Sequence, residues 1–344
     1  MMAALSAASV ARELSLPDQL MPWLESLEQS DPPSGGLQLP RGNNLAELLS
    51  RLAVVEPDLS AIVDALPDPL KQPELWWLLE RSCQQLQRTI GNWDAPARLP
   101  ALPNALGPAG RCFWIFVFLV STPAVRRWHT LRGISDDVSW STLADLGRHV
   151  SRYRRRNGAT GLDAQFWLGL HYRGALYELG RLQFSPFRLR TGMAGPLFWY
   201  EGEAAVARGS GFQVGDPVLG LHVPAGSPLL PAECDASFLQ AGLFFERHFP
   251  HHASPLVTCT SWLLDEQLAD YLPRDSNIVQ FQRRFELVPG ARDHDDEVFR
   301  WVFERVPTAS LDDLSPQTEL EHVLIRHVRA GGHWRMRTGW LLLS

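Results

Sequence analysis

Two short apolar strands, joined by a loop and one long helix, are indicated between Pro217 and Leu263. The strands are Pro217–Val223 (PVLGLHV) and Leu256–Leu263 (LVTCTSWL). Between them, Pro231–Phe249 begins with Pro at the first helical position and Glu two residues later, both favourable at a helix start. A helical connection of this length allows two neighbouring strands to run parallel. The segment therefore predicts an α/β unit with a parallel strand pair at its centre.

Further strands and helices alternate on either side of this segment. Apolar patterning predicts strands over Ala175–Phe184, Ile278–Val288 and Arg335–Leu343. It predicts helices over Ala164–Gly174, Asp265–Leu272, Asp295–Glu304 and Thr318–Ala330. The chain after about residue 160 is therefore expected to form a mixed α/β region.

The chain before residue 160 lacks this alternation and is predicted to be helical. Apolar residues recur at helical spacing in Asn44–Leu52 and Pro73–Leu86, and Ser141–Arg155 reads as a further helix. The apolar run Cys112–Val120 (CFWIFVFLV) is much shorter than the roughly 20 residues of a membrane span. We interpret it as a buried strand or a core helix, and no membrane span is expected.

The run Asn157–Gly161 (NGATG) is a strong helix breaker, and we place the domain boundary there. The sequence thus predicts an α+β protein. Its two parts are a mainly helical N-terminal domain over residues 1–160 and a mixed α/β domain over residues 161–344.

Charge and cysteine content argue against several classes of protein. The chain has 38 acidic and 32 basic residues, so no surface for nucleic acid is indicated. Its four cysteines form no C-x-x-C pair and no zinc-type spacing, so we expect neither a metal site nor a disulfide framework. The N-terminus lacks the basic region and apolar core of a signal peptide, and we expect a cytoplasmic protein.

The loop Pro224–Pro231 (PAGSPLLP) leads from the first strand into the N-terminus of the long helix. Unpaired backbone N–H groups and the positive end of the helix dipole suit a pyrophosphate at such a place. We therefore expect Ala225, Gly226 and Ser227 to lie against the phosphates of a ligand.

A splayed pair of parallel strands would expose backbone groups to an extended ligand, and the pantetheine arm of coenzyme A is such a chain. The N–H groups of Leu221 and Val223 are then candidates to hold a thioester carbonyl. Ser261, on the second strand, is a further candidate to line the same opening.

His222 and Tyr271 are the candidate catalytic residues. Pro224 has no N–H, so the first strand should open just after His222, where an imidazole could accept the proton of an attacking amine. Tyr271 lies about two turns beyond the second strand, where a phenol could protonate the departing thiolate. The alternatives are a core histidine bonded to a carbonyl and an aromatic side chain that caps a helix.

Other polar residues receive structural interpretations. We expect His171 to be a packed histidine and Glu178 to face solvent rather than serve as a base. Cys259 and Ser261 are expected to be structural rather than nucleophilic, since a nucleophile needs a base within hydrogen-bond reach and the sequence does not show one. The basic run Arg152–Arg156 (RYRRR) reads as a solvated helix end, with binding of the 3′-phosphate of coenzyme A as the alternative.

Four long stretches of the second half resemble one known family: Gly161–Phe184, Leu221–Pro250, Cys259–Phe285 and Arg329–Trp340. They are similar to the GNAT-like C-terminal domain of actinobacterial acyltransferases, and the first half resembles that family's helical N-terminal domain. The family includes long-chain N-acyltransferases that act on the amino sugar of teicoplanin-type glycopeptide antibiotics. The resemblance implies an N-acyltransferase with acyl-CoA as co-substrate, a small-molecule amine as acceptor and no permanently bound cofactor.

The sequence departs from the usual GNAT pattern at the phosphate loop. The Gln/Arg-x-x-Gly-x-Gly/Ala motif is absent, and Ala225–Gly226–Ser227 stands in its place. A non-catalytic acyl-CoA or lipid-binding protein on the same fold therefore remains an alternative. A hydrolase that uses Cys259 or Ser261 with a histidine is a third possibility, although the chain has no G-x-S-x-G elbow.

Overall fold

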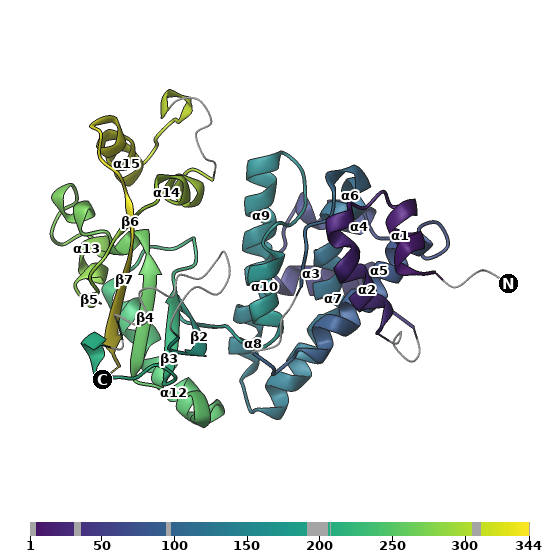
Figure 1. Cartoon of the computed structure of the whole chain (residues 1–344), viewed down its shortest axis with the longest axis horizontal. Coiled ribbons are helices and arrows are strands. Elements are labelled where there is room, and N and C mark those ends of the chain that lie inside the picture. Colours follow the sequence, from purple (N-terminus) through teal and green to yellow (C-terminus); the bar gives the residue numbers. More distant parts are fainter. Residues whose placement is uncertain are drawn as a thin grey trace. The chain divides into compact units, whose positions relative to one another are not determined.

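The computed structural model describes residues 5–30, 36–93, 98–190, 206, 208–304 and 311–343. The chain forms two compact units, Met1–Tyr177 and Glu178–Ser344. Figure 1 colours the first unit from purple to teal and the second from teal to yellow. The first unit is helical and the second contains the sheet, so the predicted α+β class is confirmed.

The first unit consists of helices packed around one apolar core. The helices are α1 (Ala7–Glu13), α2 (Met21–Glu28), α3 (Gly42–Arg51), α4 (Asp58–Asp64), α5 (Pro73–Arg88), α6 (Gly107–Arg111), α7 (Phe113–Leu131), α8 (Asp136–Leu143), α9 (Asp145–Asn157) and α10 (Gln165–Tyr172), with 3-10 turns η1 (Asp18–Leu20) and η2 (Asn104–Leu106).

Helix α7 contains the longest apolar run of the sequence and is the core helix of this unit. Phe113, Phe116 and Phe118 are each at most 1% exposed. Within the described ranges, Asn104–Leu131 is the one helical segment long and apolar enough to cross a membrane, and 67% of its apolar window is buried inside the protein. Of the two interpretations of this run, a buried strand or a core helix, the core helix is correct.

The division between the units lies later in the chain than the predicted breaker. Gly158 does end a helix, α9, in the left-handed conformation with φ 67°. The following helix, α10, nevertheless belongs to the first unit, because the ring of Tyr172 lies 4.5 Å from that of Phe118 and its hydroxyl lies 3.1 Å from Thr122 Oγ1. The expected single helix Ser141–Arg155 is also two helices, α8 and α9.

The described part of the second unit contains a seven-stranded sheet in the order β1-β2-β3-β4-β7-β5, with β6 also paired to β7. The strands are β1 (Tyr177–Leu179), β2 (Leu182–Arg188), β3 (Pro217–His222), β4 (Leu256–Ser261), β5 (Glu286–Leu287), β6 (Arg292–Asp293) and β7 (Arg335–Leu342). The helices are α12 (Pro231–His248), α13 (Asn277–Gln282), α14 (Asp295–Val302) and α15 (Glu319–Arg329), with 3-10 turns η3 (Pro250–His252), η4 (Trp262–Leu264), η5 (Glu266–Asp270) and η6 (Leu311–Asp313).

Two predicted strands have a different structure. Ala175–Phe184 is not one strand but the hairpin β1–β2, which turns at Gly180 with φ 72°. Only Glu286–Leu287 of the expected strand Ile278–Val288 is a strand, β5. Its first residues lie in helix α13, because the Ser276 side chain accepts a hydrogen bond from the N–H of Val279 and caps a helical turn. The expected helix Asp265–Leu272 is the shorter 3-10 turn η5.

The central parallel pair is present, and it separates after two residue pairs. β3 and β4 pair at Leu219↔Val257 and Gly220↔Thr258. Beyond this point β3 stays paired with β2 as far as His222, and β4 stays paired with β7 to its own last residue. The two strands thus continue with their outer partners after the ladder between them has ended, as the splayed-strand prediction requires.

Candidate active site

The end of β3 places His222 beside the point where the β3–β4 ladder stops. The imidazole is half-buried, and its Nε2 lies 3.0 Å from Oγ of Ser185 on β2. Ser185 lies directly opposite Gly220 in the antiparallel register. A Cβ atom on Gly220 would lie 2.8 Å from both Ser185 Oγ and Phe187 Cε1. The absence of a side chain at position 220 therefore makes room for the contact between serine and histidine.

The two faces of the sheet differ at this point. Leu221 lies opposite Phe184, whose ring packs 6.1 Å from Phe238 of α12, so Leu221 points toward α12 and is 2% exposed. Because side chains alternate along a strand, His222 and Gly220 point to the opposite face. The side chain of Leu221 thus packs on the α12 side of the sheet, whereas the imidazole of His222 projects from the other face.

The loop that enters α12 is held from one side by Arg181, a residue of the β1–β2 turn. Its guanidinium donates hydrogen bonds to the backbone carbonyls of Pro224 (3.0 Å), Ser227 (2.6 Å) and Pro228 (3.1 Å). The loop therefore turns these carbonyls toward β1–β2. This role of Arg181 has no signal in the sequence, since the partners lie more than forty residues away.

The three residues predicted to meet phosphates lie on this loop. Ala225, Gly226 and Ser227 are exposed, and Gly226 has φ 131°, in the region that favours glycine. The 18-residue helix α12 follows, with Pro231 at its start and Glu233 in its first turn. The loop is thus surface-accessible and fixed in shape, although the carboxylate of Glu233 already supplies negative charge at the helix end.

Ser261 and Cys259 have structural surroundings at the end of β4. Ser261 Oγ accepts a hydrogen bond from the N–H of Leu263 (3.1 Å) and caps η4. Cys259 is 2% exposed, and burial raises the pKa of its thiol to about 12. A thiol in such an environment is not ionised near neutral pH and is a poor nucleophile.

Tyr271 follows η5, and its contacts are with a different group of residues from those of His222. Its hydroxyl lies 3.0 Å from Nδ1 of His327 on α15, and its ring lies edge-on to Trp334 at 6.2 Å. The guanidinium of Arg326 lies 5.1 Å from the centre of the same ring. Tyr271 and His222 thus belong to the same unit, but Tyr271 is held by α15 and His222 by β2.

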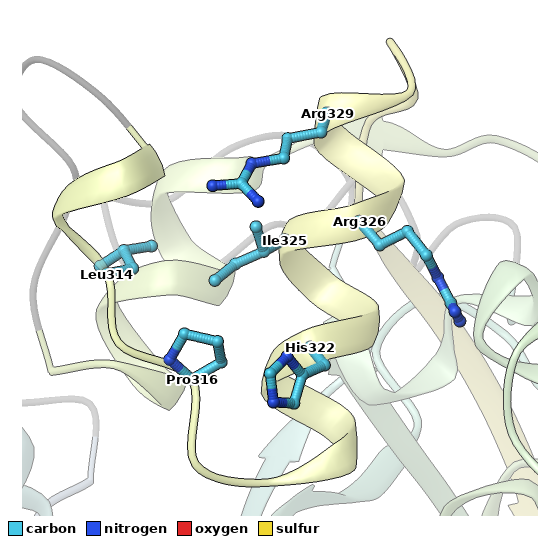
Figure 2. Close-up of a pocket in the computed structure, with 6 residues that line it drawn as sticks. All are labelled: Leu314, Pro316, His322, Ile325, Arg326 and Arg329. Carbon is cyan, nitrogen blue, oxygen red and sulfur yellow. The ribbon is translucent and has the colours of Figure 1, made fainter.

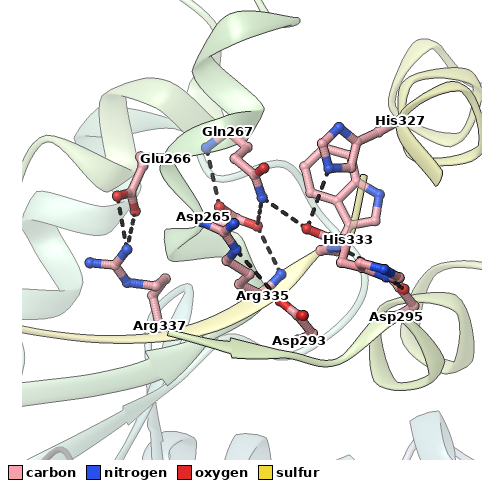
Figure 3. A network of polar contacts seen from close by, with 10 residues as sticks. Asp265, Glu266, Gln267, Asp293, Asp295, His327, His333, Arg335 and Arg337 are labelled. Carbon is pink, nitrogen blue, oxygen red and sulfur yellow. Dashed lines mark hydrogen bonds and ion pairs between the residues drawn. The ribbon is translucent and has the colours of Figure 1, made fainter. Parts of the chain in front are cut away.

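A buried carboxylate, Asp265, joins the turn after β4 to strand β7 (Figure 3). Its carboxylate accepts hydrogen bonds from the backbone N–H of Gln267 (3.2 Å), from the side-chain amide of Gln267 (3.0 Å) and from the backbone N–H of Arg335 (2.8 Å). The Gln267 amide also donates to the carbonyl of His333 (2.9 Å). This network fixes the backbone that precedes Tyr271.

A pocket of about 520 Å³ lies along α15 (Figure 2). Its lining residues lie between Leu314 and Arg329, so neither β3 nor β4 contributes to it. Its lining includes three basic side chains, those of His322, Arg326 and Arg329. Arg329 is ion-paired with Asp312. None of the residues predicted to bind coenzyme A lines this pocket.

The first unit contains a buried cluster around Asp145. This carboxylate lies 2.6 Å from Arg148 Nε, 3.2 Å from both Trp167 Nε1 and His171 Nε2, and 3.4 Å from His149 Nε2. Burial alone would raise the pKa of Asp145, but the hydrogen bonds from His149 and His171 hold it well below its usual range. His171 is completely buried here, in agreement with a packed, structural histidine.

Glu178 and the basic run Arg152–Arg156 also have defined partners. Glu178 is half-buried and accepts a hydrogen bond from the Gln183 amide (3.1 Å), so it does not simply face solvent. In the run Arg152–Arg156, Arg154 lies 2.9 Å from the buried carboxylate of Asp58, and Arg156 is ion-paired with Asp163. At least part of this run is therefore a structural element rather than a solvated helix end.

Comparisons with known proteins agree with this architecture. The chain matches the N-acyltransferase N-terminal domain over residues 43–174 and the GNAT-like C-terminal domain over residues 176–341. Among curated proteins, none matches the chain.

Among the described residues, no group of three or more His, Cys, Asp or Glu side chains could hold a metal ion.

Several solved structures are similar over the whole chain. An acyltransferase in complex with decanoyl-CoA and teicoplanin is 41% identical, with a TM-score of 0.87 over 99% of this chain and 100% of that one. An acyltransferase with CoA and 10C-teicoplanin gives the same values. One with decanoyl-CoA is 39% identical, with a TM-score of 0.88 and the same coverage. The chain therefore belongs to the family of acyltransferases that combine an N-acyltransferase N-terminal domain with a GNAT-like C-terminal domain.

Proposed function

We propose that this protein transfers an acyl group from acyl-CoA to the amine of a glycopeptide amino sugar by direct attack on the thioester. The observation that carries the proposal is the separation of β3 and β4 directly beside His222. The related acyltransferases bound to decanoyl-CoA and to teicoplanin support the choice of donor and acceptor. Acyl-CoA is then a co-substrate, and a cytoplasmic location would give access to it.

In this mechanism the pantetheine arm lies between β3 and β4, with the phosphates near Ala225, Gly226 and Ser227. The backbone N–H groups of Leu221 and Val223 hold the thioester carbonyl, and Ser261 lines the β4 side of the opening. Positioning of the two substrates supplies much of the rate.

The proton transfers are assigned to two side chains. The amine nitrogen attacks the carbonyl carbon, the new C–N bond forms, and the proton lost from nitrogen passes to His222. The C–S bond then breaks, and the thiolate of coenzyme A takes a proton from Tyr271. The products are the amide and free coenzyme A, and no bond to the enzyme forms.

The experiment is an incubation with decanoyl-CoA, with and without a glycopeptide whose amino sugar carries a free amine. Release of free thiol and the mass of the glycopeptide are followed together. Thiol release that depends on the amine, with one decanoyl group added to the glycopeptide, is the expected result. Binding of decanoyl-CoA without thiol release would instead identify a non-catalytic acyl-CoA-binding protein, the second candidate that the missing glycine-rich motif favours.

Thiol release without an amine would identify a hydrolase. The surroundings of its candidate nucleophiles argue against that outcome, because Cys259 is buried with a raised pKa and Ser261 caps η4. The same incubation therefore separates the three functions.

A further inference from the structure

We infer that Arg181 is a positioning residue for coenzyme A, which holds the loop before α12 in the shape that receives the phosphates. It does so in place of the glycine-rich motif that this sequence lacks. The inference rests on the proposed function, since it concerns how the loop at Ala225–Ser227 binds the acyl donor. Arg181 lies in the turn between β1 and β2, more than forty residues before the loop that it contacts.

The composition of the loop Pro224–Pro231 explains why it needs an external support. A loop that binds phosphates presents N–H donors and keeps its carbonyl oxygens away from the ligand, because carbonyl and phosphate oxygens repel each other. Pro224, Pro228 and Pro231 have no N–H, and Gly226 is the one glycine of the loop. A single flexible residue leaves the direction of the carbonyl groups to be fixed by another part of the chain.

The guanidinium of Arg181 fixes three of these carbonyl groups. Its Nη1 donates to the carbonyl of Pro224 (3.0 Å), its Nη2 to that of Ser227 (2.6 Å) and its Nε to that of Pro228 (3.1 Å). Each nitrogen of the planar group thus holds one carbonyl, in a fork that the compact ammonium of a lysine does not match. The carbonyl groups on both sides of Ala225 and Gly226 are therefore directed to Arg181.

The N–H groups of the same loop stay accessible. Among the described residues, the backbone N–H groups of Ala225, Gly226 and Ser227 have no hydrogen-bond partner, and all three residues are exposed. The positive charge of Arg181 lies on the side of the loop where the carbonyl groups are held. Accessible N–H groups beside a fixed positive charge form a surface that attracts an anion.

The turn that carries Arg181 is itself attached to α12. The backbone N–H of Arg181 donates to Oγ of Ser237 (2.8 Å), a completely buried hydroxyl that donates in turn to the carbonyl of Glu233 (2.9 Å). A Cβ atom on Gly180, which has φ 72°, would lie 2.7 Å from the same Oγ, so a glycine is needed for this close approach. The backbone of Arg181 therefore binds the helix, while its side chain binds the loop that leads into it.

The test uses the full-length chain with two changes at Arg181 and one matched control. Arg181→Ala removes the charge and all three hydrogen bonds, whereas Arg181→Lys keeps the charge and loses the fork. The control is Arg188→Ala, because Arg188 lies at the other end of β2 and donates to one backbone carbonyl, that of Gly215, at 2.9 Å. Thermal unfolding verifies that each variant is folded.

The first readout is the Kd for coenzyme A, measured by calorimetry, which needs no acyl transfer. Arg181→Ala should raise this Kd roughly tenfold, on the scale of one or two lost hydrogen bonds to a charged group. Arg181→Lys should recover only part of the loss, and Arg188→Ala should keep the Kd of the unsubstituted protein.

The second readout compares decanoyl-CoA with S-decanoyl-pantetheine, which carries the same thioester and no phosphate. Arg181→Ala should raise the KM for decanoyl-CoA by a similar factor with little change in kcat. It should leave kcat/KM for S-decanoyl-pantetheine close to that of the unsubstituted protein. A general loss of structure would instead lower kcat/KM equally for both donors.

An unchanged Kd for coenzyme A in Arg181→Ala overturns the inference. So does full recovery in Arg181→Lys, because charge alone would then suffice, and so does an equal loss with both donors, because the phosphates would then not be involved. An unsubstituted protein that binds coenzyme A but yields no acylated glycopeptide would contradict the proposed function and leave the effect of Arg181 on the Kd to be read separately.

Discussion

The two units each hold a histidine beside a polar partner, and the partners differ in charge. In the first unit, His171 is completely buried beside the carboxylate of Asp145, which also accepts from Arg148 and Trp167. In the second unit, His222 is half-buried, and Ser185, an uncharged hydroxyl, contacts it where two strands separate.

The comparison shows how the same side chain takes two roles. A buried ionised carboxylate that binds several donors joins helices α9 and α10, and any change in its charge would cost stability. The hydroxyl of Ser185 is uncharged, so the contact that it makes with His222 is not an ion pair.

The largest expected effect is on the rate when His222 is replaced. His222→Ala should lower kcat by about 10²–10⁴-fold, the usual contribution of a general base. The loss should shrink at high pH, because more of the amine is then already deprotonated. His222→Gln should remain slow although it preserves the packing, since an amide cannot accept the proton. Steady-state kinetics between pH 6 and 10 measure this, and a folded His222→Gln variant of near-normal rate would remove His222 from the mechanism.

Replacement of Asp145 should affect stability instead of chemistry. Asp145→Asn removes the charge that binds Arg148 and the histidines, and breaking a buried pair of this kind costs about 3–5 kcal/mol in the free energy of unfolding. The pKa of Asp145 is lower in the folded protein than in the unfolded chain, where it is about 4. The ionised carboxylate therefore stabilises the folded protein above the unfolded pKa, and this stabilisation is lost as the pH falls from there through the folded pKa. Denaturant unfolding should therefore show a smaller acid-induced loss in Asp145→Asn. An equally steep loss below pH 4 would argue against the assignment.

His129 gives the first unit a second pH dependence in a different window. Burial, with a smaller contribution from Arg126, lowers the pKa of His129 from 6.5 to about 4. The unfolded chain therefore binds a proton between pH 6.5 and 4 that the folded protein does not, and stability should fall by on the order of 3 kcal/mol as the pH falls through this window. Unfolding curves of His129→Gln should lack this slope, and a slope that persists would assign it to other groups.

The smallest expected effect concerns Tyr271. Tyr271→Phe removes the proposed proton donor and keeps the ring against Trp334, so kcat should fall about a hundredfold while the affinity for coenzyme A barely changes. The same change removes the contact with His327, which is worth about 1 kcal/mol of stability. Pre-steady-state release of thiol measures the first effect. A near-normal rate combined with lower stability would show that Tyr271 only supports α15.

The element order around α12 could be predicted from the sequence because it depends on local signals. The apolar strands, the proline at the helix start and the parallel direction of β3 and β4 all follow from neighbouring residues. The apolar pattern of Ile278–Val288 predicted a strand that forms only at Glu286–Leu287, because the cap at Ser276 favours a helix over the first part of the range.

The detail of the site could not be predicted, because it depends on pairings between distant residues. Ser185 precedes His222 by 37 residues, and only the β2–β3 register brings them together. The three bonds from Arg181 to the loop before α12 likewise require the hairpin turn at Gly180, which the sequence had indicated as continuous strand. Local patterning thus predicted where the opening lies, and long-range register determines what lines it.

The central claim, that the thioester reacts at the separation of β3 and β4, is tested most directly by a crystal structure with a ketone analogue of decanoyl-CoA that cannot transfer its acyl group. We expect the pantetheine arm between β3 and β4, the phosphates at Ala225–Ser227 and the acyl carbonyl beside His222. Coenzyme A bound elsewhere, for example at the basic pocket along α15 with His322 and Arg326 as its contacts, would contradict the account.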